Sequence, residues 1–377
     1  MAGLYIHIPF CKQACYYCDF HFSTNRSYQQ DMVSAMIKEM ELQKEYLDGE
    51  TLDTIYFGGG TPSIINLDQL ERLLNEAFKL FSVNSEAEIT LEANPDDLSK
   101  DKLKGLASLG INRLSIGIQS FDDRVLEYLH RAHNSNEAIR CIDEARNAGF
   151  QNISIDLIFS IPIATHKILN QDINTALQIN PEHISAYSLT IEEKTVFGNW
   201  LEKGKISPCS DETSAKQFEL LISTLEDNHY EQYEVSNFCR DGYYSRHNTS
   251  YWKNVPYLGI GPGAHSYNGK SRQFNLPHNP KYLKSLKKNN VPFQIEELDE
   301  VSKTNEFLLT SLRTKWGCDL NVLKEKFAYD LLNVCGREMK EFLNNELVMI
   351  DNGVVYLTKK GIMVADEIIG QLFLDPS

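Results

Sequence analysis

Short β-branched runs alternate with segments of helical periodicity over the first 190 residues of the chain. Between residues 67 and 81, for example, apolar side chains recur at i, i+3 and i+4 spacing, as in an amphipathic helix. Gly110 and Gly149 each follow such a segment, where a glycine commonly ends a helix. The predicted strands are Leu4–Ile8, Thr54–Phe57, Glu88–Glu92, Arg113–Ile118, Ser154–Ile158 and His183–Ser188. The predicted helices are Gln29–Tyr46, Leu67–Phe81, Lys100–Leu109, Asn136–Ala148 and Lys167–Ile179.

This alternation predicts an α/β fold with a parallel sheet, because repeated strand–helix–strand units have right-handed crossovers. About six units fit before residue 190, whereas a complete closed barrel needs about eight. We therefore expect residues 1–190 to form a partial, three-quarter (β/α)6 TIM-like barrel with one open side. Ligands of such a barrel bind at the C-terminal ends of the strands.

The rest of the chain predicts two further regions. Residues 191–300 are less regular and read as an extension of the barrel, with a helix at Thr213–Asp227, a strand at Tyr230–Ser236 and a glycine- and aromatic-rich stretch at Tyr243–Tyr267. Residues 301–377 predict three helices followed by a hairpin, whose turn is Asp351-Asn352-Gly353. We expect this region to be a separate, mostly helical, winged-helix-like module. Its helices are predicted at Asn305–Lys315, Leu320–Phe327 and Val334–Asn344.

Charge and composition restrict the possible functions. The chain has 377 residues and a formal net charge of −15, which disfavours nucleic acid and anionic membrane surfaces as partners. No apolar stretch is long enough to predict a membrane-spanning helix. The first residues, Met1–Ile8, do not resemble a secretory signal. We expect a cytoplasmic protein, in which the eight cysteines do not form disulfides.

Three of these cysteines stand close together just after the first predicted strand. Cys11, Cys15 and Cys18 have the spacing C-x3-C-x2-C. Three thiolates can ligate three irons of a [4Fe–4S] cluster and leave the fourth iron open. S-adenosylmethionine (SAM) can fill that position through its amino and carboxylate groups, and its reductive cleavage yields a 5′-deoxyadenosyl radical. The alternative is a zinc site in which His21 completes a Cys3His set. The other five cysteines are expected to be inert thiols.

Several motifs, taken in order, resemble one known family. They are Tyr5-Ile-His-Ile-Pro-Phe-Cys11, Tyr56-Phe-Gly-Gly-Gly-Thr-Pro62, Glu92-Ala-Asn-Pro95, Ser115-Ile-Gly-Ile-Gln-Ser-Phe121, Ile155-Asp-Leu-Ile158 and Tyr257-Leu-Gly-Ile-Gly-Pro-Gly-Ala-His-Ser266. Together they resemble the oxygen-independent coproporphyrinogen III oxidase group of radical SAM proteins. The resemblance covers nearly the whole chain, and this combination of motifs is highly specific.

The resemblance implies which residues bind the cofactors. It places the cluster on the three cysteines and the methionine end of SAM on the glycine turn, with Tyr17 against the adenine and Glu92 on the SAM at the cluster. Gln119, Arg131 and Asp156 match positions that bind a second SAM, so one or two SAM molecules are expected. The full implied set of cofactor-binding residues is Tyr5, Tyr17, Gly59, Gly60, Thr61, Glu92, Gln119, Arg131, Asp156, Ala186, His247 and His265.

Two of these assignments have alternatives from the residues alone. A lone glutamate at a strand end, such as Glu92, is often a solvated loop charge. Asp156 is the only charge in an apolar strand, so a structural ion pair would also explain it.

The family has two branches, and several features favour one of them. True oxidases carry a further cysteine two residues after the triplet, where this chain has Phe20, and an extension before the segment that begins here at Tyr5. The stretch His247-Asn-Thr-Ser-Tyr-Trp252 resembles the HNxxYW motif of the other branch, the heme chaperones called HemW. Ser160-Ile-Pro162 departs from the family's Gly-Leu-Pro, and serine should tolerate this turn unless a positive φ is required.

The HNxxYW match makes His247 the first candidate for a heme iron ligand, because imidazole is a suitable axial ligand. Tyr251 and Trp252 would then pack on the macrocycle. The alternative is a hydrogen-bonded structural histidine. His265, in a glycine-rich turn, is the second candidate.

The resemblance thus implies a heme chaperone that binds heme, carries a SAM-liganded [4Fe–4S] cluster and passes heme to an acceptor protein. The alternative is an oxygen-independent coproporphyrinogen III oxidase, so whether the chain is an enzyme stays open at this point. A third alternative is a redox or regulatory binding protein that acts through the C-terminal module. The expected partners are heme and a heme-acceptor protein. This acceptor is either free or associated with a membrane, and the chain itself is either a monomer or a homodimer. No nucleic acid is expected.

Overall fold

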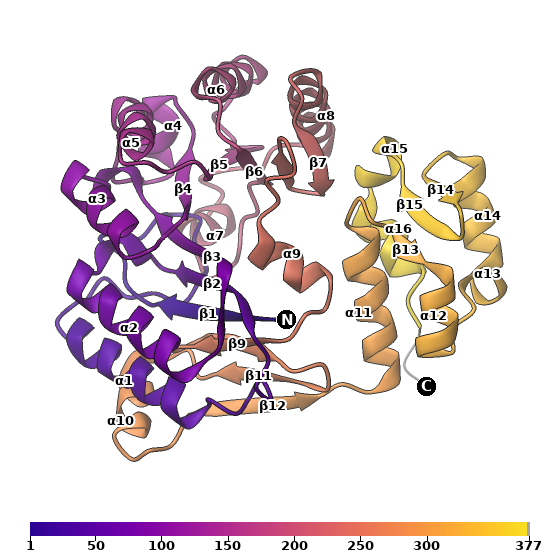
Figure 1. Cartoon of the computed structure of the whole chain (residues 1–377). Coiled ribbons are helices and arrows are strands. Elements are labelled where there is room, and N and C mark those ends of the chain that lie inside the picture. The colour runs from indigo at the N-terminus through magenta and orange to yellow at the C-terminus, as the bar shows by residue number, and fades with distance from the viewer. Residues whose placement is uncertain (375–377) are drawn as a thin grey trace.

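Six parallel strands form the centre of a curved twelve-stranded sheet in the computed structural model, which describes residues 1–374. These strands are β1 (Ala2–Ile8), β2 (Leu52–Gly59), β3 (Val83–Ala93), β4 (Arg113–Gln119), β5 (Ile153–Phe159) and β6 (His183–Ser188). Each strand pairs with the next one in the chain, and the helices between them cover the outer face (Figure 1). The prediction of an open (β/α)6 barrel is confirmed.

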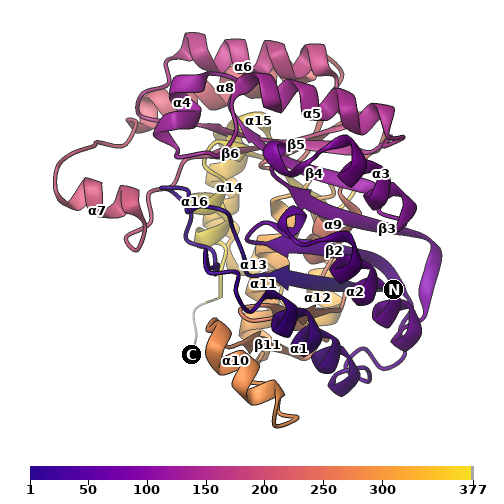
Figure 2. The same cartoon turned by 90° about the vertical axis from the view of Figure 1, so that its left-hand side faces the viewer.

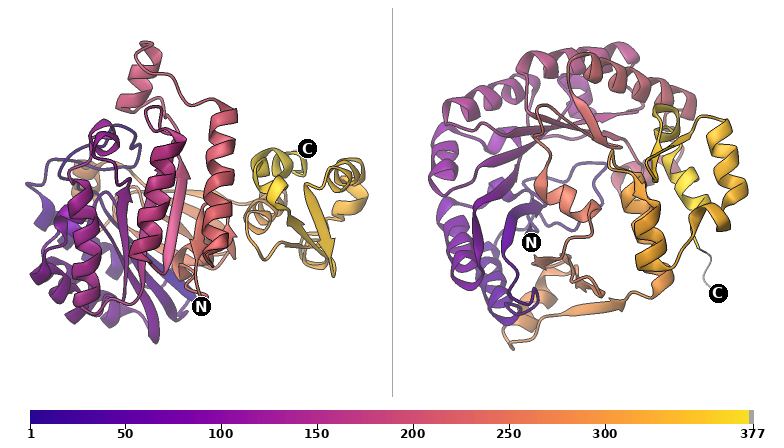
Figure 3. Two further views of the ribbon diagram at one scale, coloured as in Figure 1. Left: turned by 90° about the horizontal axis from the view of Figure 1, so that it is seen from above. Right: turned by 45° about the vertical axis from the view of Figure 1, so that its right-hand side comes forward.

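Further strands extend both edges of this sheet. β9 (Tyr257–Ile260) pairs in parallel with β1 and is followed by the antiparallel strands β10 (His265–Tyr267), β11 (Ser271–Asn275) and β12 (Phe293–Glu297). At the other edge, β8 (Asn237–Cys239) pairs with β6, and β7 (Glu231–Glu234) pairs with β8. The sheet therefore curves most of the way round an interior, as the right-hand view of Figure 3 shows.

The outer helices bury one apolar stripe each against the sheet. In α2 that stripe includes Leu70, Leu73 and Ala77, and the helix starts at a capping box between Asn66 and Gln69. The helices of the barrel are α1 (Gln29–Leu42), α2 (Leu67–Leu80), α3 (Lys100–Ser108), α4 (Asp123–Tyr128), α5 (Ser135–Asn147), α6 (His166–Ile179) and α8 (Asp211–Asp227), with short 3-10 turns η1 (Pro62–Ile64) and η2 (Pro95–Asp97). α10 (Asn279–Leu286) packs on α1 at the other edge.

Two short helices lie away from this outer layer. α7 (Val196–Glu202) projects from the barrel beside the N-terminal loop after β1 (Figure 2). α9 (Arg246–Trp252) lies on the concave side of the sheet, against β1 and β2 and next to α11 (Figures 1 and 3). Neither helix is evident from periodicity, because a helix this short is held by tertiary packing rather than by its own propensity.

The C-terminal module has its own apolar core and a three-stranded sheet in the order β13-β15-β14. Its elements are α11 (Glu300–Leu312), β13 (Cys318–Asp319), α12 (Leu320–Phe327), α13 (Leu331–Val334), α14 (Gly336–Asn344), β14 (Val348–Asp351), β15 (Val354–Leu357), α15 (Lys359–Ile362) and α16 (Ala365–Gln371). The hairpin forms where predicted. The helix predicted at 334–344 corresponds to α14, which begins at Gly336, and a further short helix, α13, precedes it and meets it at Cys335.

The first helix of this module spans the open side of the barrel. At one edge, Arg272 on β11 pairs with Glu306 on α11 at 3.0 Å. At the other, the backbone N–H of Val235 donates to Arg313 O at 3.2 Å, and that of Lys315 donates to Tyr233 O at 3.0 Å. The module therefore closes the gap that six strand–helix units leave. None of the helices between residues 1 and 374 is both long and apolar enough to cross a bilayer.

Candidate functional site

The three clustered cysteines lie in the loop that follows β1 and line one cavity of about 450 Å³. Two backbone bonds to Ser23 fix the start of the loop: Cys11 N–H donates to Ser23 O at 3.1 Å, and Ser23 N–H donates to Pro9 O at 3.0 Å. The middle is held by Tyr16, whose N–H donates to Leu129 O at 3.2 Å. The cavity is also lined by residues that end β2, β3, β4 and β5, as expected for an α/β barrel.

The chemistry of this loop fits an iron–sulfur cluster. The three thiols are free and half-buried. Burial raises the pKa of Cys11 to about 11 and that of Cys18 to about 12, so bound metal cations are what would keep them as thiolates. Two donors reach the sulfurs: Arg131 Nη1 lies 3.3 Å from Cys15 Sγ, and Thr61 Oγ1 lies 3.4 Å from Cys11 Sγ. A cubane takes one thiolate per iron, so its ligands border a cavity rather than converge on one point.

The zinc alternative is not favoured by the same residues. The Nε2–H of His21 donates to Asn279 Oδ1 at 2.7 Å, and the ring faces the turn at Gly263, not the cavity. Within residues 1–374, no three His, Cys, Asp or Glu side chains are grouped as a single metal ion requires. None of the other five cysteines lines the cavity, and they lie at Cys141, Cys209, Cys239, Cys318 and Cys335.

The glycine turn after β2 forms the wall next to Cys11. A β-carbon on Gly60 would lie 2.7 Å from Phe10 O and 3.0 Å from Cys11 Sγ, so no side chain fits there. Gly59 has φ of 111° and a β-carbon position 2.7 Å from the His7 ring. Thr61 continues the turn and reaches the Cys11 sulfur. All three expected residues, Gly59, Gly60 and Thr61, therefore line the cavity, where backbone amides can approach a ligand closely.

Glu92 is not a solvated loop charge. Its Oε1 accepts a hydrogen bond from Tyr56 Oη at 2.8 Å, and its Oε2 accepts one from the Gly59 N–H at 3.2 Å. Burial raises the pKa of this carboxyl to about 7, although both hydrogen bonds lower it. The side chain lines the cavity, so a ligand ammonium placed there would be held by a carboxylate of fixed orientation.

The residues predicted to bind a second SAM, Gln119, Arg131 and Asp156, line the same cavity. Arg131 Nη2 donates to Asn94 Oδ1 at 2.6 Å and to Gly117 O at 2.8 Å, which fixes the guanidinium between β3 and β4. The pKa of Asp156 is raised to about 6 by burial, while hydrogen bonds from Ser185 and Ser115 lower it. Gln119 has a positive φ of 70° at the end of β4. Together with Tyr17, whose ring also lines the cavity, these residues form its polar wall.

Four predicted residues lie outside the lining of the cavity. Ala186 is buried in the core on β6, and its neighbour Tyr187 lines the cavity instead. Tyr5 lies on β1, and its hydroxyl is 3.1 Å from His7 Nδ1. His265 is exposed at the start of β10, with its ring edge-on to Phe274 at 4.7 Å.

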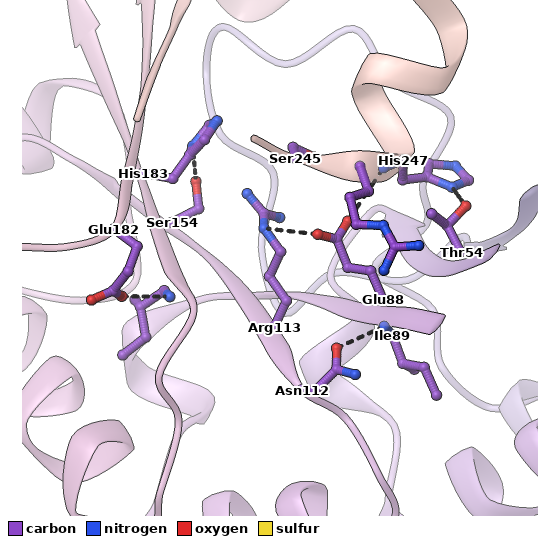
Figure 4. A network of polar contacts seen from close by, with 12 residues as sticks. Thr54, Glu88, Ile89, Asn112, Arg113, Ser154, Glu182, His183, Ser245 and His247 are labelled. Atoms are coloured by element: carbon purple, nitrogen blue, oxygen red, sulfur yellow. Dashed lines mark hydrogen bonds and ion pairs between the residues drawn. The ribbon is translucent and has the colours of Figure 1, made fainter. Parts of the chain in front are cut away.

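His247, the fourth, is buried on α9, with an exposure of only 1% (Figure 4). Its Nδ1 lies 2.7 Å from Thr54 Oγ1, and its Nε2 lies 2.7 Å from Tyr251 Oη. Its backbone N–H donates to Glu88 Oε1 at 3.2 Å. Burial lowers the pKa of the ring to about 3, so the imidazole is neutral. Both ring nitrogens are therefore engaged within the protein.

The interior around α9 is a polar and aromatic network rather than an apolar core. Arg113 is 1% exposed, and its Nε lies 4.0 Å from Glu88 Oε2 (Figure 4). On the next strands, His183 Nδ1 lies 2.7 Å from Ser154 Oγ. A buried charge pair of this kind needs further hydrogen bonds, and the N–H of His247 provides one to Glu88.

Sequence reasoning missed two residues that hydrogen-bond to the predicted ligand-binding side chains Glu92 and Arg131. Tyr56 stands in a quoted motif, directly before the glycine turn, but its hydroxyl bond to Glu92 depends on strand pairing. Asn94, from Glu92-Ala-Asn-Pro95, accepts from Arg131. Their place in the motifs was the available signal.

Comparison with known proteins gives consistent matches along the chain. Residues 5–175 match the family described as the Radical SAM superfamily, and residues 299–364 match the HemN C-terminal domain. The chain is 36% identical to a protein named heme chaperone HemW from Bacillus subtilis, with 98% of each chain covered. It is 34% identical to a protein of that name from Lactococcus lactis, with coverage of 98% of this chain and 97% of the relative.

A solved structure gives the same fold. Coproporphyrinogen III oxidase (HemN) from Escherichia coli superimposes with a TM-score of 0.85 and 22% sequence identity, covering 99% of this chain and 90% of that one. At this identity the likeness concerns the fold, including the C-terminal module.

Proposed function

The chain belongs to the HemW family of the radical SAM superfamily, and from that premise we propose that it is a heme chaperone. It would bind heme, carry a [4Fe–4S] cluster with SAM, and pass heme to an acceptor protein. The observation that supports this most is full-length similarity to proteins named heme chaperone HemW, combined with His247-Asn-Thr-Ser-Tyr-Trp252 in the barrel interior.

The cofactor site of this proposal is the cavity at the strand ends. Cys11, Cys15 and Cys18 would hold the cluster, and Glu92 with the Gly59–Thr61 turn would hold the amino end of SAM. When bound, the cluster and SAM together supply one-electron chemistry. Tyr17 would pack against the adenine, and Gln119, Arg131 and Asp156 would complete the site for this or a second SAM. The cavity volume of about 450 Å³ falls in the usual range for cofactor sites.

His247 is the heme ligand we propose, and the structure sets a condition on it. A neutral imidazole is the form that binds iron, and burial keeps this ring neutral. Binding requires that the hydrogen bonds to Thr54 and Tyr251 break and that α9 or its ring moves. α9 lies beside α11, where the C-terminal module meets the barrel, so a shift of the module would remove one of the packing contacts of α9. His265 is the alternative ligand because it is already exposed.

The acceptor is a heme-binding protein that would meet the chain in the cytoplasm. The net charge of −15 argues against nucleic acid and anionic membrane surfaces as partners. An acceptor could still be membrane-associated, since it would supply that anchor itself. A homodimer is compatible with this role, and the cofactor-binding residues proposed for the cavity all come from one chain.

One experiment separates this function from that of a coproporphyrinogen III oxidase. Anaerobically reconstituted protein is given coproporphyrinogen III, SAM and a reductant, and in parallel is titrated with heme. We expect saturable heme binding and no protoporphyrinogen IX. Product formation at a useful rate would refute the chaperone proposal.

A further inference from the structure

A direct line of contacts joins the cofactor cavity to α9. Tyr56 Oη donates to Glu92 Oε1 at 2.8 Å, and Glu92 lines the cavity. The ring of Tyr56 stacks on the ring of His247, with centroids 4.9 Å apart and an interplanar angle of 21°. One tyrosine therefore touches both the proposed SAM-binding carboxylate and the proposed heme ligand.

Both ends of this line are fixed by other groups. His247 is anchored by Thr54, two residues before Tyr56 on β2, and by Tyr251 on α9. Glu92 has one other donor within hydrogen-bond distance, the N–H of Gly59. Tyr56 also stacks on Tyr5, with centroids 6.1 Å apart, so its ring contacts both β1 and α9. Displacing His247 would remove the nearer of the two rings on which Tyr56 stacks.

We propose that Tyr56 is a positioning residue that orients the Glu92 carboxylate for SAM, and that the buried ring of His247 holds Tyr56 in place. SAM binding then depends on α9 staying packed against β1 and β2, with His247 buried. No family motif quoted above gives Tyr56 such a role; the hydrogen bond and the stack assign it.

This inference rests on the proposed function in one respect. If His247 leaves the interior to bind heme iron, Tyr56 loosens and Glu92 loses its better donor. Heme binding would then weaken SAM binding, and by thermodynamic linkage SAM would weaken heme binding by the same factor. Each cofactor would then lower the affinity of the chain for the other without excluding it.

The first test is SAM titration of cluster-loaded protein carrying Tyr56→Phe, which removes only the hydroxyl. We expect SAM affinity to fall about tenfold, which is the equivalent of one hydrogen bond to a charged group. The matched control is Tyr46→Phe, because the Tyr46 hydroxyl has no hydrogen-bond partner within residues 1–374 and lies outside the cavity lining. Equal affinities of Tyr56→Phe and wild type would overturn the proposal.

A pH profile separates positioning from a general loss of structure. Glu92 faces Tyr56, Tyr5, Asp156 and Arg113, and of these only Tyr56 donates a hydrogen bond to it. Without that hydroxyl the carboxyl should ionise at higher pH, so the midpoint of SAM binding against pH should move upward in Tyr56→Phe. If SAM affinity falls equally at every pH and the midpoint does not shift, the role of Tyr56 is merely structural and the assignment is overturned.

A double-mutant cycle then tests the role of His247. His247→Ala should weaken SAM binding several-fold in the wild-type background and have no further effect in Tyr56→Phe, because both changes act through one hydroxyl. Additive effects would contradict the coupling. With heme present, wild-type SAM affinity should fall and that of Tyr56→Phe should not. A chain that fails to bind heme would refute the proposed function, while the cycle, which uses no heme, still decides whether His247 and Tyr56 position Glu92.

Discussion

Ser160 stands at the end of β5 with a backbone conformation that favours glycine. Its φ is 57°, in the left-handed region, and the side chain is 4% exposed. Its Oγ is buried without a hydrogen-bond partner among residues 1–374. Serine is expected to tolerate this turn unless a positive φ is required. The structure has a positive φ at Ser160, so that expectation is wrong. We predict that Ser160→Gly stabilises the protein.

The magnitude follows from three contributions. A non-glycine residue in the left-handed region is destabilised by about 1–2 kcal/mol, and an unsatisfied buried hydroxyl costs about 1–3 kcal/mol. Glycine loses more backbone freedom on folding, which opposes these gains by about 0.5–1 kcal/mol. The N–H of Ser160 donates to Gln217 Oε1 at 2.7 Å, and glycine keeps this bond. With the low end of each favourable range, Ser160→Gly should raise the free energy of unfolding by about 1–2 kcal/mol.

The assay is thermal and urea unfolding of wild type and three variants under identical cluster loading. Ser160→Gly should raise the thermal midpoint by about 1–3 °C in a chain of this length. Ser160→Ala removes the hydroxyl but keeps the φ strain, so it should recover only part of the gain. Ser154→Gly is the matched control on the same strand, and it should destabilise because Ser154 Oγ lies 2.7 Å from His183 Nδ1. A midpoint for Ser160→Gly at or below that of wild type would refute the reasoning.

Three further predictions concern the cluster, the glycine turn and a buried carboxylate. Alanine at any one cysteine of the triplet should abolish iron–sulfur absorption, whereas Cys141→Ala should leave the spectrum unchanged. Gly60→Ala should lower cluster loading and SAM binding at least tenfold, because its β-carbon would lie 2.7 Å from Phe10 O; Gly336→Ala, with open space around it, is the control. Burial raises the pKa of Glu39 from an ordinary value of 4.5 to about 7, so the folded state binds this proton more tightly than the unfolded state. The free energy of unfolding should therefore fall as pH rises from about 5 to 7, and Glu39→Gln should show a shallower fall; equal slopes in urea titrations would contradict this.

The barrel and the cavity could be predicted from the sequence because their signals are local. The strand–helix alternation shows in periodicity, and the triplet with the turn at Gly59 and Gly60 occupies contiguous motifs. Since parallel strands end at one edge of a sheet, these motifs had to meet. Placing Glu92 and Asp156 on the cavity follows from the same rule, and the structure has both there.

The interior of the barrel could not be predicted in this way. The His247 motif indicates a ligand by resemblance, but the burial of the ring depends on α9 packing against β1 and β2, strands that lie about 200 residues earlier. The stack on Tyr56 has the same origin. Likewise, the strain at Ser160 depends on a φ angle that only the folded strand end imposes. Contacts between distant segments, not local patterns, determine these features.

The central claim is that the chain carries heme through a histidine of its own. The most direct measurement is the amount of heme that stays with the protein through gel filtration, for wild type, His247→Ala and His265→Ala. The account predicts about one heme per chain for wild type and His265→Ala, and loss of heme for His247→Ala. Heme retention by His247→Ala equal to wild type would contradict the ligand assignment, and no retention by wild type would contradict the chaperone function itself.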